Sequence, residues 1–249
     1  MNENEIKREL RGKIELFYYT ETDSTNKRAG EYARTAEKIK PTLFIARRQS
    51  AGRGRLGRAF LSDDGGIYMS LLMPSSNLNV MEITPKAAAL AADVLDRSIG
   101  LEVGIKWVND LYINGKKLAG ILTEGAFDEN GNLRYFIVGM GINVYKNASL
   151  TANCPIATTI EDALGKRVDI NALAAELAMR IMEDLENSDC LQGYRDRCIV
   201  IGKRVTVLGY NESYPAMCLG VDDDYSLIVR RESDGEIIKI STGEVSIRL

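Results

Sequence analysis

The sequence predicts an α/β (α+β) body over residues 1–201 and a small all-β tail over residues 202–249. In the first part, strand-like runs alternate with amphipathic helical segments, and in the second, short strands alternate with Gly, Asn and Asp turns. The chain has 249 residues, 45% apolar and 27% charged, which is the composition of a globular protein. It is long enough to bury a sizeable core.

Strands are predicted in the body wherever short runs of apolar and β-branched residues are bounded by turn residues. They cover residues 14–19, 42–47, 66–73, 103–107, 111–113, 116–126 and 134–140. Asn114-Gly115 is a two-residue hairpin signal, and residues 128–132 form another turn. Residues 48–66 contain Gly, Arg and Asp without an apolar period, which predicts a long loop, and long loops in compact domains are often functional.

Helices are predicted where apolar residues recur at helical spacing after a capping residue. The first covers residues 26–36, the second starts with Thr84 as its cap and Pro85 in its first turn and ends before Gly100, and the third starts after Asp169. The residues before the first helix are all common N-cap types: Asp23, Ser24 and Thr25. The third helix carries a single apolar stripe formed by Ile170, Leu173, Ala174, Leu177, Ile181 and Leu185.

The predicted tail consists of strands over residues 204–208, 214–221, 226–231, 236–240 and 244–248. The runs are short and regularly spaced, which is typical of a small closed β-barrel. We therefore expect the tail to be a second unit attached to the α/β body.

The composition excludes several kinds of chemistry. The chain has no histidine, which rules out Ser-His and Cys-His nucleophile pairs and histidine metal ligands. A net charge of -3 argues against a protein whose main role is to neutralise nucleic acid, so an anion site must be local. The cysteines lack C-x-x-C spacing, so we expect reduced thiols and no protein-only metal site. Without a signal-like or membrane-spanning run, the protein is expected to be cytoplasmic and to use no membrane.

Residues 47–58 are the sharpest local feature of the sequence. Glycines let the backbone approach a ligand and arginines supply forked anion donors, which predicts a phosphate site. Gly52, Gly54 and Gly57 match G-x-G-x-x-G, but no helix follows them and no acidic residue ends a strand about twenty positions later, so a dinucleotide fold is rejected. An RNA-binding tail lacks support because the segment has no repeats or aromatic partners. A solvated basic loop is the alternative.

Two further segments contain candidate site residues. Lys117 lies where a hairpin becomes an apolar strand, which indicates a partly buried stem with its ammonium aimed at a defined place. A lysine on a hairpin edge without a function is the alternative. Residues 139–144 end a strand with small residues, and a tight corner without ligand contact is the alternative to a binding role.

Taken together and in this order, these segments resemble the bacterial biotin protein ligases, also called biotin-acetyl-CoA-carboxylase ligases. The resemblance runs from about Ile14 to the end of the chain. It is carried by Ser24-Thr25-Asn26, Gln49 and residues 52–58, 106–111, 117–124 and 139–144. Val108 replaces the usual proline and Leu56 the usual arginine, and we expect both departures to be tolerated because the flanking polar residues remain.

The resemblance implies a class II aminoacyl-tRNA synthetase-like catalytic domain with a C-terminal SH3-like β-barrel. It also implies a ligase that forms biotinyl-5'-AMP from biotin and ATP with Mg²⁺ and transfers biotin to a lysine of a biotin carboxyl carrier protein, such as that of acetyl-CoA carboxylase. Only about thirteen residues precede the first predicted strand, so we expect a short form without the N-terminal DNA-binding domain of some relatives, and no DNA partner. A homodimer is compatible with the sequence.

The resemblance and residue chemistry together assign roles. Neutral polar side chains suit the ureido ring of biotin, and cations suit two mutually repelling anions. The biotin-binding set is Ser24, Thr25, Asn26, Gln49, Arg53, Gly54, Arg55 and Lys117. The ATP or adenylate set is Arg55, Arg58, Asn109 and Asn143, and the catalytic set is Lys117, Arg55 and Arg53. Residues 48–60 are expected to move until anions arrive, because arginines alone have little to hold them.

Two other functions remain open from the sequence. The nearest is a lipoate or octanoate ligase, whose fold and adenylation chemistry are related. The other is a nucleotide- or RNA-binding module without catalysis, against which the net charge weighs.

Overall fold

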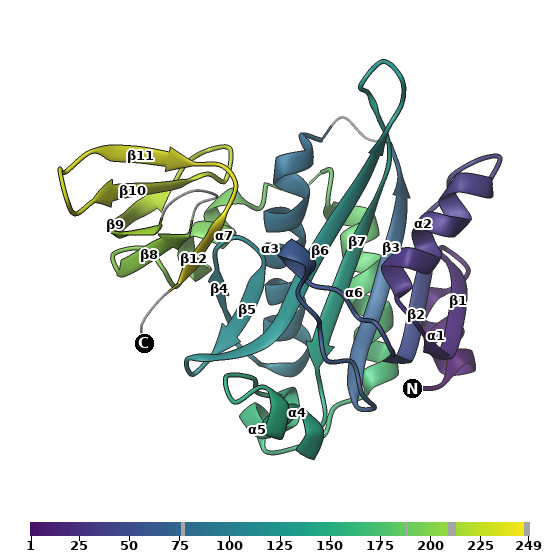
Figure 1. Cartoon of the computed structure of the whole chain (residues 1–249). Coiled ribbons are helices and arrows are strands. Elements are labelled where there is room, and N and C mark those ends of the chain that lie inside the picture. Colours follow the sequence, from purple (N-terminus) through teal and green to yellow (C-terminus); the bar gives the residue numbers. More distant parts are fainter. Residues whose placement is uncertain (76–77, 188, 209–212, 247–249) are drawn as a thin grey trace.

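The computed structural model describes residues 1–75, 78–187, 189–208 and 213–246 (Figure 1). These residues form a large mixed sheet with helices on it and a second, smaller antiparallel sheet near the C-terminal end. The predicted α/β body followed by an all-β tail is therefore confirmed. Among the described helices, none combines the length and the apolar character that crossing a bilayer requires.

The large sheet has seven strands in the order β1-β2-β3-β7-β6-β5-β4. Its strands are β1 (Glu15–Thr22), β2 (Thr42–Gln49), β3 (Gly66–Pro74), β4 (Gly104–Lys106), β5 (Asp110–Ile113), β6 (Lys116–Phe127) and β7 (Leu133–Asn143). The pair β1 and β2 is parallel and the other neighbours are antiparallel. Every strand predicted in the body is present, with ends that differ by a few residues.

The described helices are α1 (Glu3–Leu10), α2 (Thr25–Thr35), α3 (Val80–Ile99), α4 (Ala148–Asn153), α5 (Ile160–Leu164), α6 (Ile170–Asp184) and α7 (Leu191–Arg197). Ser24 caps α2 and Asp169 caps α6, as predicted. The predicted start of α3 at Thr84 and Pro85 is wrong. The side chain of Asn79 accepts a hydrogen bond from the N–H of Met81 and starts this helix a turn earlier.

The two faces of the large sheet bury different sets of residues. On β2, Leu43 and Ile45 belong to the main core beneath α1, α3 and α6, whereas Phe44 belongs to a smaller core against α2. This alternation follows from the period of two along a strand. The helix α2 thus lies across β2, β3 and β7, and its N-terminus reaches the sheet face that carries the candidate site.

The small sheet has the strand order β11-β10-β9-β8-β12. Its strands are β8 (Arg204–Leu208), β9 (Ser213–Val221), β10 (Leu227–Arg231), β11 (Ile237–Ile240) and β12 (Glu244–Ser246). Of the strand predicted over 244–248, residues 247 and 248 lie outside the described residues. Among the described residues, β11 and β12 are the two edge strands of this sheet and are not paired with each other. The predicted closure of the sheet into a barrel therefore stays a prediction.

The small sheet packs directly on the body. Its apolar side chains belong to the same buried cluster as those of the large sheet. The indole N–H of Trp107, just after β4, donates to the backbone oxygen of Tyr225 at 2.9 Å in a buried setting. The boundary predicted between residues 201 and 202 falls just before β8, the first strand of the small sheet, and both sheets share one apolar core. The division into two domains therefore stays a prediction.

Candidate active site

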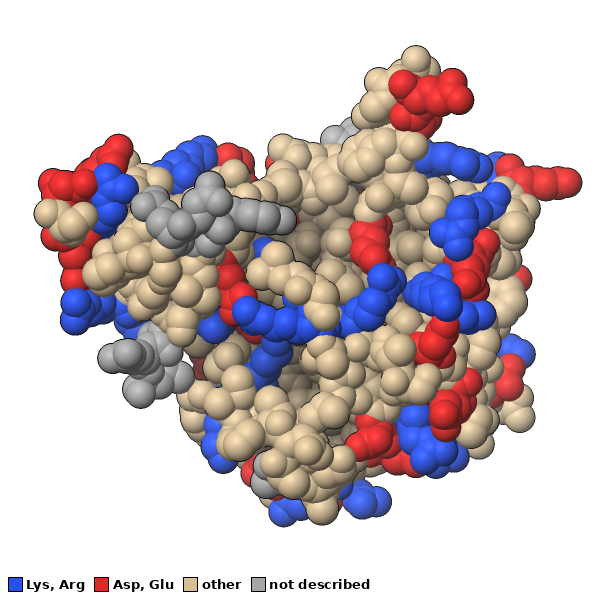
Figure 2. All heavy atoms as spheres, viewed as in Figure 1, with Lys and Arg blue, Asp and Glu red and all other residues tan. Residues whose placement is uncertain are grey.

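A cavity of about 870 Å³, including its open mouth, lies over β6 and β7. Its wall is formed by the N-terminus of α2, by residues 50–61, which we call the glycine–arginine loop, by the β5–β6 hairpin and by β12. Figure 2 shows a band of Lys and Arg side chains crossing this face of the molecule beside a hollow. The predicted residues that line the cavity are Ser24, Thr25, Asn26, Gln49, Arg53, Gly54, Arg55, Arg58, Asn109 and Lys117.

One end of the cavity, which we call the neutral end, is formed by uncharged polar groups. Ser24, Thr25 and Asn26 are each less than 7% exposed. The backbone N–H and the hydroxyl of Thr25 donate to Gln49 Oε1 at 2.8 and 3.1 Å. Ser70 Oγ lies 2.5 Å from Asn26 Oδ1 and 2.7 Å from Thr25 Oγ1. These buried bonds fix the side chains, because a buried polar group without a partner is destabilising.

Glycines form the floor of the neutral end. Gly139 and Gly141 lie on β7, and Gly120 lies opposite Gly141 on β6. A Cβ atom at Gly139 would lie 2.1 Å from Asn26 Oδ1, and one at Gly141 would lie 2.4 Å from the ring of Phe60. Glycine is therefore required at Gly139 and Gly141 because other groups approach the backbone closely. Neither residue has the positive φ that favours glycine at other positions.

The other end of the cavity, the cationic end, holds the arginines of the loop. Arg55 donates to Asn109 Oδ1 at 3.1 Å and to the backbone oxygen of Gly243 at 2.8 Å. Arg58 forms a two-pronged ion pair with Glu244, with contacts of 2.7 and 2.6 Å. Burial alone would raise the pKa of Glu244, but the bond and charge of Arg58 outweigh it and lower that pKa.

Arg53 connects the loop to the neutral end. Its guanidinium donates to the carboxylate of Glu124 on β6 at 3.3 Å. The other oxygen of Glu124 accepts from the side-chain amide of Asn26 at 2.7 Å. The amide of Asn26 is thereby oriented with its nitrogen toward Glu124 and its oxygen toward Ser70. One carboxylate thus links the orientation of a neutral-end side chain to the position of the loop.

Lys117 lies at the start of β6 between the two ends: its Nζ is 3.4 Å from the position of a Cβ atom at Gly120, in the glycine floor, and it contacts Asp110, the neighbour of Asn109 at the cationic end. Its Nζ is 2.8 Å from Asp110 Oδ1, a contact with the distance of an ion pair but without the alignment of a hydrogen bond. Among the described buried side chains, that oxygen is the one polar atom without a hydrogen-bond donor. The backbone of Lys117 is fixed on both sides, by Ile156 at 2.7 Å and Thr158 at 2.9 Å. Its ammonium is therefore aimed from a rigid strand.

The structure corrects one expectation about the loop. We expected little to hold residues 48–60 without anions, but each arginine that lines the cavity has a partner in the protein. The loop contains a single 3₁₀ turn over Arg55–Gly57, in which Leu56 adopts a φ of 56°. The absence of a helix after the glycines agrees with the rejection of a dinucleotide fold. Each of the arginines that line the cavity therefore has a defined position without an anion.

Asn143 is the predicted site residue that the structure does not bring to this cavity. It lies at the end of β7, where it pairs with Gly66, and it lines a separate small cavity beside Tyr68. Its assignment as an adenylate contact stays a prediction that the geometry does not favour.

The Trp107–Val108 peptide bond is cis. Val108 is the residue that stands where the family usually has proline.

Several lining residues were missed by sequence reasoning. Lys106 faces the cavity, with its amine 5.7 Å from the ring centre of Tyr112, and burial lowers its pKa. Phe60 covers the glycine floor, and Glu244 comes from β12. Lys106 could have been found from its place in the segment 106–111, which carries part of the family resemblance. Glu244 could not, because it is 186 residues from its partner Arg58 and no local pattern reveals such a pairing.

Comparison with known families shows which family this fold and cavity belong to. The sequence model of the biotin/lipoate A/B protein ligase family matches residues 18–143, half of the chain. The chain belongs to this family. The matched segment includes the neutral end, the glycine–arginine loop, Lys117 and the glycine floor, so the family relationship covers the parts that build the cavity.

Relatives of known name match nearly the whole chain. The bifunctional ligase/repressor BirA of Bacillus spizizenii is 30% identical over 99% of this chain and 79% of its own length. The biotin–[acetyl-CoA-carboxylase] ligase of Mycobacterium tuberculosis is 30% identical over 93% of this chain and 88% of its own length. These matches confirm the resemblance to the biotin protein ligases.

Solved structures confirm the fold. The biotin protein ligase of Aquifex aeolicus in complex with biotin and ATP superimposes on this chain with a TM-score of 0.78. The two are 26% identical, and the match covers 94% of this chain and 98% of that one. The predicted class II aminoacyl-tRNA synthetase-like body with a C-terminal β unit is thus the observed fold class.

Proposed function

We propose that this chain is an ATP-dependent ligase that forms biotinyl-5'-AMP from biotin and ATP and then transfers the biotinyl group to a lysine of a biotin carboxyl carrier protein. One observation carries the proposal: a single cavity has a buried neutral end, a cationic end and the ammonium of Lys117 between them. Two of the similar proteins named above support the choice of substrate: one is a biotin–[acetyl-CoA-carboxylase] ligase, and the other is a biotin protein ligase in complex with biotin and ATP.

The neutral end suits the head of biotin. The ureido ring has one acceptor and two donors and no charge, so it requires neutral partners in a fixed geometry. The Ser24, Thr25 and Gln49 groups supply these partners, and their mutual hydrogen bonds hold them in place before the ligand binds. The ring of Phe60 and the glycine floor provide an apolar surface for the aliphatic part.

The first step joins two anions. An oxygen of the biotin carboxylate attacks the α-phosphorus of ATP, the new C–O–P linkage forms, and pyrophosphate leaves. Arg53, Arg55 and Lys117 neutralise the carboxylate and the α-phosphate as they approach, and Arg58 lies toward the departing pyrophosphate. Mg²⁺ enters as part of the substrate, on the phosphate oxygens of ATP. The described residues contain no group of three His, Cys, Asp or Glu side chains placed to hold a metal.

The second step requires a neutral amine at the adenylate carbonyl. The amine of the carrier lysine attacks that carbon, an amide forms as the nitrogen loses one proton to water, and AMP leaves with the bonding electrons of the C–O bond. Lys117 is placed to stabilise the oxyanion and the leaving phosphate. With no histidine in the chain, holding the two reactants in one cavity supplies much of the rate.

Pyrophosphate exchange into ATP tests the proposal. Exchange should depend on biotin and should be weak or absent with lipoate or octanoate, because the neutral end offers hydrogen bonds that a fatty chain leaves unpaired. Exchange with lipoate or octanoate alone would establish the rival ligase activity. If none of the three acids supports exchange and the chain binds RNA tightly, the non-catalytic module would be favoured. A cytoplasmic location, a homodimer and the lack of a DNA partner stay predictions.

A further inference from the structure

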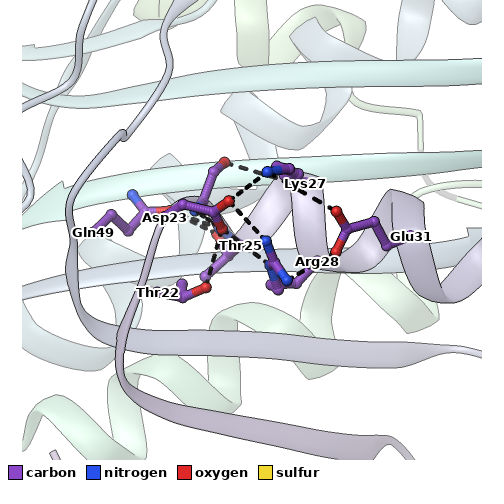
Figure 3. Close-up of polar contacts among 8 residues, drawn as sticks. Thr22, Asp23, Thr25, Lys27, Arg28, Glu31 and Gln49 are labelled. Carbon is purple, nitrogen blue, oxygen red and sulfur yellow. Dashed lines mark hydrogen bonds and ion pairs between the residues drawn. The ribbon is translucent and has the colours of Figure 1, made fainter.

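Asp23 lies in the link between β1 and α2, directly before the three residues of the neutral end, and its carboxylate collects donors from several directions (Figure 3). The N–H of Ser24 donates at 2.7 Å, Arg28 donates through two nitrogens at 3.0 and 2.7 Å, and Lys27 donates at 2.7 Å. This carboxylate was not among the residues that the sequence singled out for a binding role.

Charge explains why a carboxylate is needed at this position. The first turn of α2 contains Lys27 and Arg28 and no acidic residue. The N-terminus of a helix already carries a partial positive charge, so two further cations there repel it and each other. Arg28 in the first place, and then Lys27, hold the pKa of Asp23 far below its usual range. Asp23 is therefore anionic at neutral pH.

The backbone of Asp23 has a second contact. Its carbonyl oxygen accepts from the N–H of Ala51 at 2.9 Å, and the carbonyl oxygen of Thr22 accepts from Ser50 at the same distance. These bonds hold the first residues of the glycine–arginine loop against the end of β1. One residue thus touches both the segment that forms the neutral end and the segment that carries the arginines.

Capping alone does not account for Asp23. The helix has its own capping residue, Ser24, whose Oγ accepts from the N–H of Lys27. The N–H of Thr25 is satisfied by Gln49. What Asp23 adds is a fixed position for the Ser24 backbone and neutralisation of two cations next to a site for an uncharged ring.

We propose that Asp23 is a positioning residue for the biotin head: it orients Ser24, Thr25 and Asn26 and keeps the charges of Lys27 and Arg28 away from the neutral end. This inference rests on the proposed function. It predicts an effect on biotin binding that is separate from ATP binding and from global stability. The bond from Asp23 to the loop is made by its backbone, which a substitution keeps, while among the described residues its side chain bonds only to Thr22, Ser24, Lys27 and Arg28.

Steady-state pyrophosphate exchange on the full chain tests this. For Asp23→Ala we expect the KM for biotin to rise at least about tenfold, while the KM for ATP stays within about twofold. Asp23→Asn keeps an acceptor for Ser24 but loses the charge, so we expect a smaller rise. In Asp23→Asn, Glu31 is the one acidic partner left to Arg28, at 2.9 Å, and to Lys27, at 4.0 Å, so one positive charge beside the neutral end stays without a counter-charge. Adding Arg28→Gln removes one of these two cations and should lower the KM for biotin again. A residue that only stabilised the fold would not show this recovery.

The matched control is Asp169→Ala. Asp169 also precedes a helix and accepts hydrogen bonds from the N–H groups of Asn171 and Ala172, but that helix is α6 and Asp169 does not line the cavity. We expect this variant to lose thermal stability and to keep the KM for biotin. The inference is overturned if Asp23→Asn leaves that KM unchanged, if both KM values rise together, or if Arg28→Gln gives no recovery. A wild-type chain without biotin-dependent exchange would overturn the proposed function itself, and this inference with it.

Discussion

Lys117 is the residue on which both proposed steps depend. Its ammonium is partly buried, its backbone is fixed by the segment 156–158, and its nearest partner is Asp110. An amine held in this way contributes charge to the reacting groups without first having to be ordered. Its neighbour Lys116 is exposed on the same hairpin and has no such setting.

We predict that Lys117→Ala abolishes labelling of the carrier protein, with at least about a hundredfold loss in rate, and leaves the fold intact. Lys116→Ala is the control and should label at the wild-type rate. The measurement is incorporation of biotin into a purified carrier domain, with circular dichroism to check the fold. Labelling by Lys117→Ala at near wild-type rates would overturn its role.

The glycine floor gives a second prediction at this scale. A methyl group at Gly139 would overlap Asn26 Oδ1, so Gly139→Ala should weaken biotin binding at least about tenfold, within the ~1–3 kcal/mol range of overpacking. Gly193→Ala is the matched change, since nothing lies near its Cβ within α7 and alanine favours a helix. Calorimetry with biotin should show a difference between the two variants, and equal affinities would contradict the close contact.

At the scale of elements, the site is assembled where β6, β7, α2, the glycine–arginine loop and β12 meet. The loop reaches β12 through Arg58 and Glu244, and the turn before β12 through Arg55 and Gly243. The small sheet therefore contributes to the cationic end, a role that its own sequence did not indicate.

We predict that Glu244→Gln loosens the loop. The Arg58 side chain of this pair is 62% exposed, although that of Glu244 is 22% exposed. The effect should therefore be modest, about two- to fivefold faster amide exchange for residues 54–58 without ligands, consistent with ~0.4–1 kcal/mol. Biotin and ATP should restore protection. Glu232→Gln, which breaks a pair with Arg204 in the same sheet, is the control. Hydrogen exchange followed by mass spectrometry measures these rates. Identical rates in the wild-type chain, Glu244→Gln and Glu232→Gln would show that the ion pair between Arg58 and Glu244 does not hold the loop.

Local patterns predicted elements well where the signal was itself local. Asn114-Gly115 forms the predicted hairpin, with positive φ at both residues, and Asp169 caps α6. The start of α3 was misplaced because Pro85 fits the first turn of a helix, while the true capping residue, Asn79, lies a turn earlier. Helix α1 was missed since it buries only Ile6 and Leu10, too few to show a period.

For the site, ten of the lining residues were predictable because the family resemblance and residue chemistry mark them directly. Residues that reach the cavity through the fold were not. Phe60 is fixed by its place over two glycines on other strands, and Glu244 by the packing of a second sheet. Such contacts depend on tertiary arrangement, which spacing along a chain does not encode.

At the scale of the whole molecule, the cysteines serve the core and contribute nothing to the proposed chemistry. The four are free thiols, three of them buried. Burial raises the pKa of Cys198 to about 11 and that of Cys218 to about 12, from an ordinary value of 9.0. Both thiols are therefore protonated in the folded chain at neutral pH, as expected for reduced structural cysteines.

These shifts predict a loss of stability in alkali. The unfolded chain releases the thiol proton near pH 9 and the folded chain only near pH 11, so the free energy of unfolding falls between these values, by ~1.4 kcal/mol per pH unit for each thiol. Cys198→Ala removes one such group and should flatten the slope by that amount. Urea unfolding at pH 8, 9, 10 and 10.5 measures it, and equal slopes for both proteins would contradict the raised pKa.

The large sheet, the loop and the small sheet together form one cavity that is neutral at one end and cationic at the other. A crystal structure of the chain with biotin and ATP or their adenylate tests this arrangement most directly. We predict that the ring of the acid lies against Thr25 and Gln49, and that its carboxyl carbon and the α-phosphate lie between Arg55 and Lys117. Density for either ligand away from this cavity would contradict the proposed function.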